Sequence, residues 1–260
     1  MTFHINPDWV YFYFLYYFRI LFFLLPLPLF TPGVIPLTVL AYLVFALSWL
    51  FVQMVPPPHG LVMPTNLAHL GVLIFKEALL GFILGFFVRL IFTLFTVYGE
   101  IVTLHVGLGM TNMVLPGFGH MTVFGNLFRV IGTLIFLSAG GLEVLFYGLK
   151  LSFEVIPPTQ FNPFVLDYKM FALLLVKVFS IALAMALPFI AVYMLINIVL
   201  AITNRLVPNV NIFFVGYPVY MLANFALLVV LIPSIVYLGQ RYVGDYLKMF
   251  IDFIRSFPTH

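Results

Sequence analysis

The residues of this chain that could carry chemistry are few, and most of them lie in or beside long apolar stretches. His105 and His120 share one glycine-rich region, and Glu100 lies just before it. A carboxylate in an apolar helix can relay protons, although pairing within a packed interface is its more common use. No clear Asp/Glu pair stands beside the histidines, and the sequence lacks HExxH, GxSxG and phosphate-binding-loop motifs. We therefore expect no enzyme activity, no catalytic residue, no cofactor and no metal site.

Several other charged residues interrupt or border apolar segments. With Glu100 they form a set of seven: Arg19, Lys76, Glu77, Arg89, Glu100, Arg129 and Lys177. A charge at the bilayer centre costs at least about 2.5–3.5 kcal/mol, so helices with so many charges are not expected to face bulk lipid. Lys76 and Glu77 project about 100° apart on a helix, so each is expected to find its partner elsewhere. Three explanations of these charges stay open: they pair within the bundle, the helices pack in an assembly, or the charges lie outside the hydrocarbon layer.

The composition indicates a polytopic membrane protein. Of 260 residues, 64% are hydrophobic and 7% are charged, and apolar runs of about 20 residues are typical of spanning helices. Cysteine is absent, which excludes disulfides and thiolate metal sites. The formal net charge is +3 and the basic residues are scattered, so nucleic acid is not an expected partner, whereas membrane lipid is.

Proline, glycine and polar turns divide the chain into six apolar segments within a single domain over residues 1–260. The predicted segments are 9–30, 34–55, 67–98, 127–149, 170–201 and 212–238. A polar connection at 154–167 precedes the fifth segment, and a tight polar loop at 203–211 joins the last two. The predicted fold class is all-α, with about six long apolar helices.

The stretch from Gly99 to Asn126 breaks this pattern with repeated glycines. Irregular backbone at membrane depth must be buried in protein or line an aqueous path, because lipid cannot bond its polar groups. The sequence therefore predicts a constriction or pore element here.

Two further patterns concern helix packing. Gly81 and Gly85 form a GxxxG spacing, which predicts a close approach of two helix backbones without naming the partner. Residues 239–260 show an amphipathic pattern with one apolar and one charged face. For this tail we favour an interfacial helix on the membrane surface, and a partner-docking helix is the alternative.

Two motifs resemble signatures of the FliR family of flagellar export proteins. The first contains Gly99, Glu100, Ile101, Gly107, Leu108 and Pro116, and the more specific second contains Asn204, Arg205, Pro208, Asn211, Ile212, Phe213, Gly216 and Pro218. Chain length and segment order are also similar, so the resemblance covers almost the whole chain. Leu115 and Leu142 depart from residues that the family often has, Asp and His, so no role that is specific to an Asp or His side chain is transferred to these two positions.

The resemblance implies a core subunit of the export gate in the bacterial inner membrane, at the flagellar basal body. FliR-like proteins assemble with FliP-like and FliQ-like subunits into a pore for unfolded flagellar proteins, and an FlhB-like subunit joins them. Residues 9–149 would correspond to a FliP-like part and 170–238 to a FliQ-like hairpin. Family members sit largely raised out of the membrane plane, which would explain the charges in apolar helices.

In this family the glycine-rich loop plugs the closed channel, which implies the same role for residues 107–124. The plug residues would be Gly107, Gly109, Met110, Met113, Leu115, Pro116, Gly117, Phe118, Gly119 and Met121. Methionine repacks easily, a hydrophobic constriction blocks ions by dewetting, and glycine lets a loop bend. A simple packed re-entrant turn is the alternative.

Two other functions and one question of orientation stay open. A virulence type III secretion homologue, SctT-like, shares much of the pattern. A stand-alone small-solute transporter would need matching broken helices in both halves, and only one broken region is visible. The positive-inside rule places both termini in the cytoplasm, whereas a FliQ-like hairpin would place the Arg205 loop there.

Overall fold

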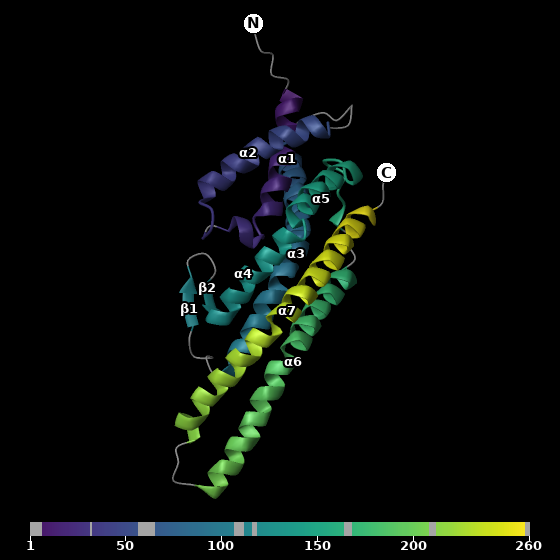
Figure 1. Cartoon of the computed structure of the whole chain (residues 1–260). Helices are drawn as coiled ribbons and strands as arrows, with labels where there is room; N and C mark the ends of the chain where they lie inside the picture. Colours follow the sequence, from purple (N-terminus) through teal and green to yellow (C-terminus); the bar gives the residue numbers. More distant parts are fainter. Residues whose placement is uncertain are drawn as a thin grey trace. The chain divides into compact units, whose positions relative to one another are not determined.

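The chain is described by a computed structural model over residues 7–31, 33–56, 66–106, 112–115, 119–163, 168–207 and 212–257 (Figure 1). Its helices are α1 (Pro7–Leu24), η1 (Pro28–Phe30), α2 (Leu37–Met54), α3 (Leu67–Val106), α4 (Val123–Ser138), α5 (Gly141–Val155), α6 (Tyr168–Leu206) and α7 (Ile212–Arg255). Strands β1 (Asn112–Leu115) and β2 (Gly119–Thr122) form one antiparallel hairpin. The predicted all-α membrane architecture is confirmed, and the small hairpin is an addition that the sequence analysis did not predict.

Four of the described helices are long and apolar enough to cross a membrane. They are Leu37–Met54, Leu67–Val106, Lys169–Leu206 and Gly216–Arg255, and the pair α4–α5 adds a fifth if it is counted as one broken span. The predicted first segment is shorter than expected, because the apolar part of α1 covers only Val10–Leu24. Pro26 and Pro28 follow within four residues, and proline cannot continue a helix hydrogen-bond ladder.

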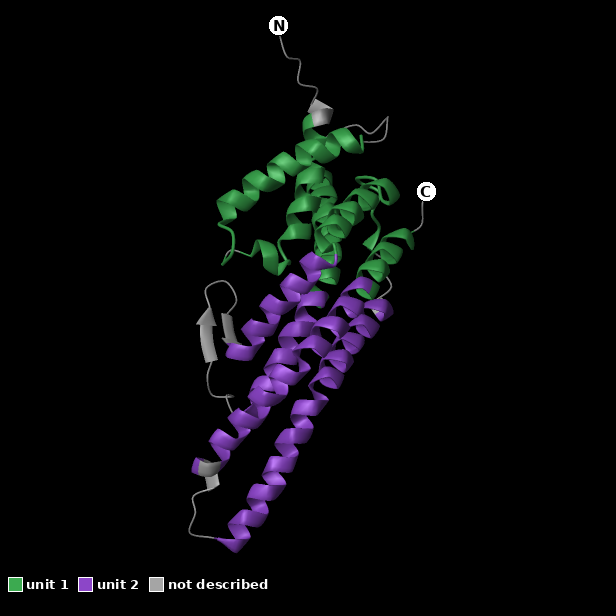
Figure 2. Ribbon diagram, viewed as in Figure 1, with its two compact units in different colours: residues 1–90, 140–168, 245–260 green, residues 91–139, 169–244 purple. Residues whose placement is uncertain are grey.

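The chain forms two compact units (Figure 2). Unit 1 contains Met1–Leu90, Gly140–Tyr168 and Asp245–His260, and unit 2 contains Ile91–Ala139 and Lys169–Gly244. The candidate plug region therefore belongs to unit 2, together with most of α6 and α7. The buried charges Arg19 and Glu77 belong to unit 1.

In unit 1, the GxxxG pair packs α3 against α1. A Cβ atom added at Gly81 would collide with the backbone carbonyl of Arg19, and one added at Gly85 would collide with that of Phe23. The two carbonyls lie four residues apart on α1, which matches the glycine spacing on α3. The predicted close approach is confirmed, and its partner is a helix of the same chain.

The predicted fourth segment, 127–149, is wrong as a single helix. The structure divides it into α4, which ends at Ser138, and α5, which begins at Gly141. Gly140 lies in the break with φ of 73°, a left-handed conformation that glycine adopts without steric cost. Gly140 therefore separates the two helices, and Gly141 begins the second.

The predicted tail is not a separate helix, because α7 runs without a break to Arg255. Its apolar stripe is buried within the protein: Val243, Leu247, Phe250, Ile254 and Phe257. In unit 1 the Phe250 ring packs against Phe23, Phe87 and Gly148. The amphipathic pattern was thus correct, but the favoured location on the membrane surface was wrong, since this face is already covered by protein.

In unit 2, helices α6 and α7 form a long hairpin (Figure 1). The rings of Tyr193 and Tyr220 lie 5.0 Å apart between the two helices, and a Cβ atom at Gly216 would lie 2.8 Å from Leu200 Cδ1. Gly216, a residue of the second motif, thus lies beside the Leu200 side chain of α6. The predicted loop at 203–211 begins later than expected, because α6 continues to Leu206.

Candidate functional site: the supports of the glycine-rich segment

The last turns of α3 carry the side chains that support the glycine-rich segment. We predicted that the helix would end at Tyr98, but it continues through Gly99 to Val106. A Cβ atom at Gly99 would lie 2.5 Å from the carbonyl oxygen of Phe124 at the start of α4. Gly99 of the first motif is therefore helical, and its lack of a side chain lets α4 approach α3 closely.

Three residues fasten the end of the β-hairpin to α3, and we call Glu100, Thr103 and Thr122 the strand-end anchor. The backbone amide of Thr122 donates to Glu100 Oε1 at 3.2 Å, and the hydroxyl oxygens of Thr103 and Thr122 lie 2.7 Å apart. Thr122 is also the N-cap of α4, since its Oγ1 accepts from the Gly125 amide at 3.0 Å. Of the two uses weighed for Glu100, the structure shows the packed, hydrogen-bonded one.

The β-hairpin occupies part of the proposed plug. Its register pairs Met113 with Met121 and Leu115 with Gly119 along the backbone. The remaining plug residues lie outside the described residues, namely Gly107, Gly109, Met110, Pro116, Gly117 and Phe118. The lumen-facing assignment of these side chains therefore stays a prediction.

The second motif is distributed over the ends of α6 and α7. Asn204 and Arg205 are exposed in the last turn of α6, while Gly216 is buried and Pro218 exposed in α7. Phe213 lies in the first turn of α7, and Pro208 and Asn211 lie outside the described residues. The exposed position of Arg205 suits contact with a partner or solvent more than a role in packing.

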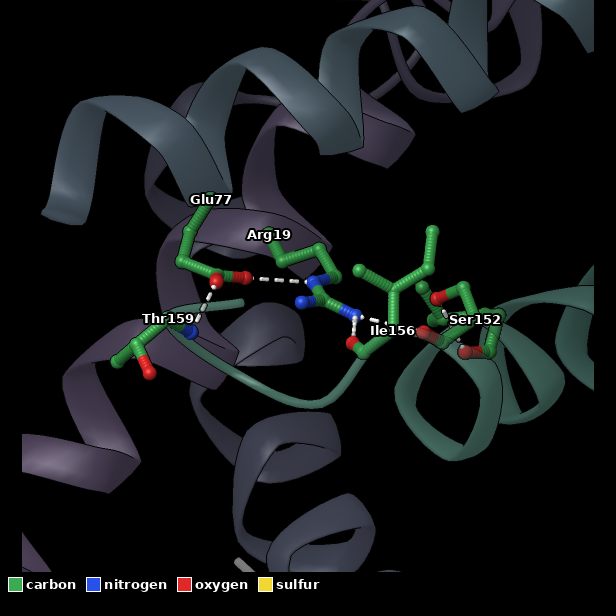
Figure 3. Close-up of polar contacts among 6 residues, drawn as sticks. Arg19, Glu77, Ser152, Ile156 and Thr159 are labelled. Carbon is green, nitrogen blue, oxygen red and sulfur yellow. Dashed lines mark hydrogen bonds and ion pairs between the residues drawn. The ribbon is translucent and has the colours of Figure 1, made fainter. Parts of the chain in front are cut away.

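A buried ion pair in unit 1 supplies two of the missing charge partners (Figure 3). Arg19 Nε donates to Glu77 Oε2 at 2.6 Å, and both side chains are fully buried. Arg19 Nη1 donates to the carbonyls of Ser152 and Ile156, each at 2.9 Å, and the Thr159 amide donates to Glu77 Oε1 at 2.9 Å. The pair thus joins α1, α3, the end of α5 and the loop that follows it.

The other predicted buried charges are less deeply placed. Arg129 Nη2 donates to Asn126 Oδ1 at 2.8 Å within α4, and Lys76 is partly buried. Arg89 and Lys177 lie on exposed helix faces. In the part of the chain that the structure describes, no three His, Asp or Glu side chains converge on a common point where a metal ion could bind.

Some supporting residues were not identified from the sequence. These residues are Thr103, Thr122 and Asn224, which are uncharged, polar and buried. A polar residue that is this deeply buried usually has a hydrogen-bond partner, which makes it informative once burial is known. The sequence signal was weak, because Thr and Asn also occur on ordinary helix surfaces.

These features define a polytopic helical membrane protein with a hairpin inserted between two of its helices. The profile of the family described as "Bacterial export proteins, family 1" matches residues 10–245. The chain is 36% identical over 246 residues to the flagellar biosynthetic protein FliR of Aquifex aeolicus, covering 94% of this chain and 93% of that one. It is 30% identical over 180 residues to FliR of Bacillus subtilis, covering 67% and 69%, and 27% identical over 188 residues to FliR of Escherichia coli, covering 70% of each. This chain belongs to the FliR family of bacterial export proteins, as the two motifs predicted.

Proposed function

We propose that this chain is a non-catalytic core subunit of the flagellar type III protein export gate in the bacterial inner membrane. The observation that carries the proposal is the family match over residues 10–245, together with relatives that are named as flagellar biosynthetic proteins. These names favour the flagellar system over the virulence homologue. Residues 9–149 form the FliP-like part, and 170–238 form the FliQ-like hairpin.

Helix length supports a subunit that extends beyond the hydrocarbon layer. Helices α3, α6 and α7 have 40, 39 and 44 residues. At about 1.5 Å per residue each is roughly 60 Å long, about twice the 30 Å thickness of a bilayer core. Charged residues on exposed faces, such as Lys177 and Arg241, then lie where water or partner subunits reach them.

The distribution of burial supports assembly with further subunits. The apolar window of α3 is 67% buried, whereas those of α2, α6 and α7 are only 17–28% buried. The apolar faces of these three helices are exposed in the isolated chain. We propose that they contact membrane lipid or the helices of FliP-like, FliQ-like and FlhB-like subunits.

Within this assembly, residues 107–124 are the proposed plug of the closed pore. The strand-end anchor supports this assignment, because it holds the end of the segment against α3 rather than leaving it as a free loop. Unfolded flagellar proteins would pass when the segment moves aside.

Native mass spectrometry tests the proposed function. This chain is co-expressed with the FliP-like and FliQ-like proteins of the same genome, and each partner is omitted in turn as the matched control. We expect one discrete complex that contains all three chains and is lost when the FliP-like protein is omitted. A stable chain that ignores both partners would contradict the proposal and favour the transporter.

A further inference from the structure

Helix α4 begins with one half of a capping box. In a capping box, a Ser or Thr at the N-cap accepts from the amide of the third helical residue, N3, and a Glu or Gln at N3 accepts from the N-cap amide. Thr122 makes the first of these bonds, because its Oγ1 accepts from the Gly125 amide at 3.0 Å. Gly125 occupies N3 and has no side chain, so α4 cannot make the second bond with its own N3 residue.

Glu100 on α3 makes this second bond from a different helix. The Thr122 amide donates to Glu100 Oε1 at 3.2 Å. The carboxylate also lies where Gly125 would carry a side chain, because a Cβ atom added there would collide with Glu100 Oε1 and lie 2.9 Å from Glu100 Cδ. A negative group beside the first turn is also favoured by the positive end of the helix dipole. Glu100 thus takes the place of a Glu at N3 of α4.

Two glycines make this arrangement possible. A Cβ atom added at Gly99 would lie 2.8 Å from Gly125 Cα, so α3 and α4 touch through backbone at this point. A side chain at Gly125 would displace the Glu100 carboxylate from the Thr122 amide. Gly99, Glu100 and Gly125 therefore form one structural unit, although only the first two belong to the first motif.

We propose that Glu100 is a positioning residue whose carboxylate caps α4 from α3, in place of the side chain that Gly125 lacks. The cap sets where β2 ends and α4 begins relative to α3. It assigns the carboxylate to hydrogen bonding at a fixed position rather than to proton transfer. The contact itself stands on described residues, and only the export measurement below rests on the proposed function.

Amide hydrogen exchange tests the cap on the full-length protein, purified with the subunits that it retains. Glu100→Ala should make exchange at residues 122–126 about fivefold faster, the factor that corresponds to one lost hydrogen bond of about 1 kcal/mol. Glu100→Gln should leave this exchange nearly unchanged, because its side-chain oxygen still accepts. Exchange at residues 141–150 in α5 should stay the same in both variants.

Moving the carboxylate onto α4 tests the exchange of roles between the two positions. The double variant Glu100→Ala with Gly125→Glu builds a complete capping box within α4 and should restore most of the slow exchange at 122–126. Its matched control is Glu100→Ala with Gly125→Ala, which adds a stronger helix former without an acceptor and should restore less. Equal recovery in the two double variants would contradict the proposal, as would a Glu100→Ala variant that exchanges normally at 122–126 or faster in both regions alike.

Flagellar export in cells separates the cap from proton transfer. Glu100→Gln and the double variant with Gly125→Glu should retain export, whereas Glu100→Ala should reduce it. Loss of export in Glu100→Gln with unchanged exchange at 122–126 would show that the acid itself acts, and the positioning role would be wrong. Normal export in cells that lack this chain would contradict the proposed function, and the exchange results would still decide the role of Glu100.

Discussion

Arg19 and Glu77 form an ion pair that is fully shielded from solvent, with Nε and Oε2 2.6 Å apart. Removing two charges from water is costly, and the mutual attraction offsets that cost only when further hydrogen bonds complete the pair. Here two carbonyls and one amide add such bonds, while Arg19 Nη2 has no hydrogen-bond partner among the described residues. The Arg19 guanidinium also lies 4.3 Å from the centre of the Phe153 ring. The pair thereby specifies how α1, α3 and the loop after α5 meet.

Removing one member of this pair should destabilise the protein strongly. Glu77→Gln leaves the Arg19 charge buried without a counter-ion, and breaking a buried pair in this way costs about 3–5 kcal/mol. Thermal unfolding of the purified export-gate complex measures the effect, and we expect a lower midpoint or no assembly. Lys150→Ala is the control, because the exposed Lys150–Glu154 pair contributes at most about 1 kcal/mol.

The double substitution Arg19→Met with Glu77→Leu separates charge balance from packing. It removes both charges and puts apolar side chains in their place, and replacing a buried ion pair by well-packed apolar residues is often neutral or stabilising. We expect the double variant to recover most of the stability that Glu77→Gln loses. A double variant that is less stable than the single one would show that the bonds to Ser152, Ile156 and Thr159 matter more than charge balance.

A side chain at either glycine of the GxxxG pair should separate α1 from α3. Gly85→Val would push a branched side chain into the carbonyl of Phe23, and backbone atoms cannot move aside cheaply. We expect loss of the folded subunit from membranes, measured by its yield in the purified complex. Gly71→Ala on the same helix meets nothing within 4 Å and should be tolerated, with a gain of up to about 1 kcal/mol in helix propensity. Equal yields of the two variants would contradict the packing seen in unit 1.

The features that were predicted correctly are those that the sequence encodes locally. The stripe of Val243, Leu247, Phe250, Ile254 and Phe257 repeats with helical spacing, and all five residues are buried. The cover of that stripe was predicted wrongly, because periodicity shows which face is apolar but not whether lipid or protein covers it. Gly81 and Gly85 likewise predicted a close approach but not its partner.

The features that were missed either depend on contacts between distant parts of the chain or have a weak local pattern. Arg19 and Glu77 lie 58 residues apart, and no spacing rule relates charges at that separation. The β-hairpin was missed because its two strands have four residues each and glycines surround them, so the pattern resembled a loop. The helix break at Gly140 was missed because apolar residues continue on both sides of it.

A disulfide should be able to replace the hydroxyl contact between Thr103 and Thr122. The chain has no cysteine of its own, so in the double variant Thr103→Cys with Thr122→Cys the cysteine at position 103 can form a disulfide within one copy of the chain only with the cysteine at position 122. The oxygens are 2.7 Å apart, which brings the two side chains within reach of a sulfur–sulfur bond. We expect spontaneous cross-linking in the purified complex, detected by mass spectrometry of a peptide pair.

Flagellar export in cells then tests whether the strand-end anchor stays closed when the pore opens. Because the anchor connects only α3 and α4, we expect export to persist in the cross-linked variant, with the reduced form and each single cysteine variant as controls. Export that stops on oxidation and returns on reduction would show that the end of the segment also has to move.

Deleting residues 109–119 tests the plug directly. The deletion leaves the strand-end anchor in place, since Glu100, Thr103 and Thr122 all lie outside it. The four residues that remain between Val106 and Thr122 form five links, which reach about 17 Å when extended, and Thr122 lies against Thr103 only one turn from Val106. The shortened connection can therefore close without moving α4, and we expect assembly to be intact.

The closed pore should leak ions because its hydrophobic constriction is lost, and the membrane conductance of resting cells measures this leak. A glycine–serine replacement of equal length should leak as well, since it keeps the chain length but removes the methionine and phenylalanine side chains. Unchanged conductance in both variants would show that residues 107–124 do not seal the pore and would favour a packed re-entrant turn.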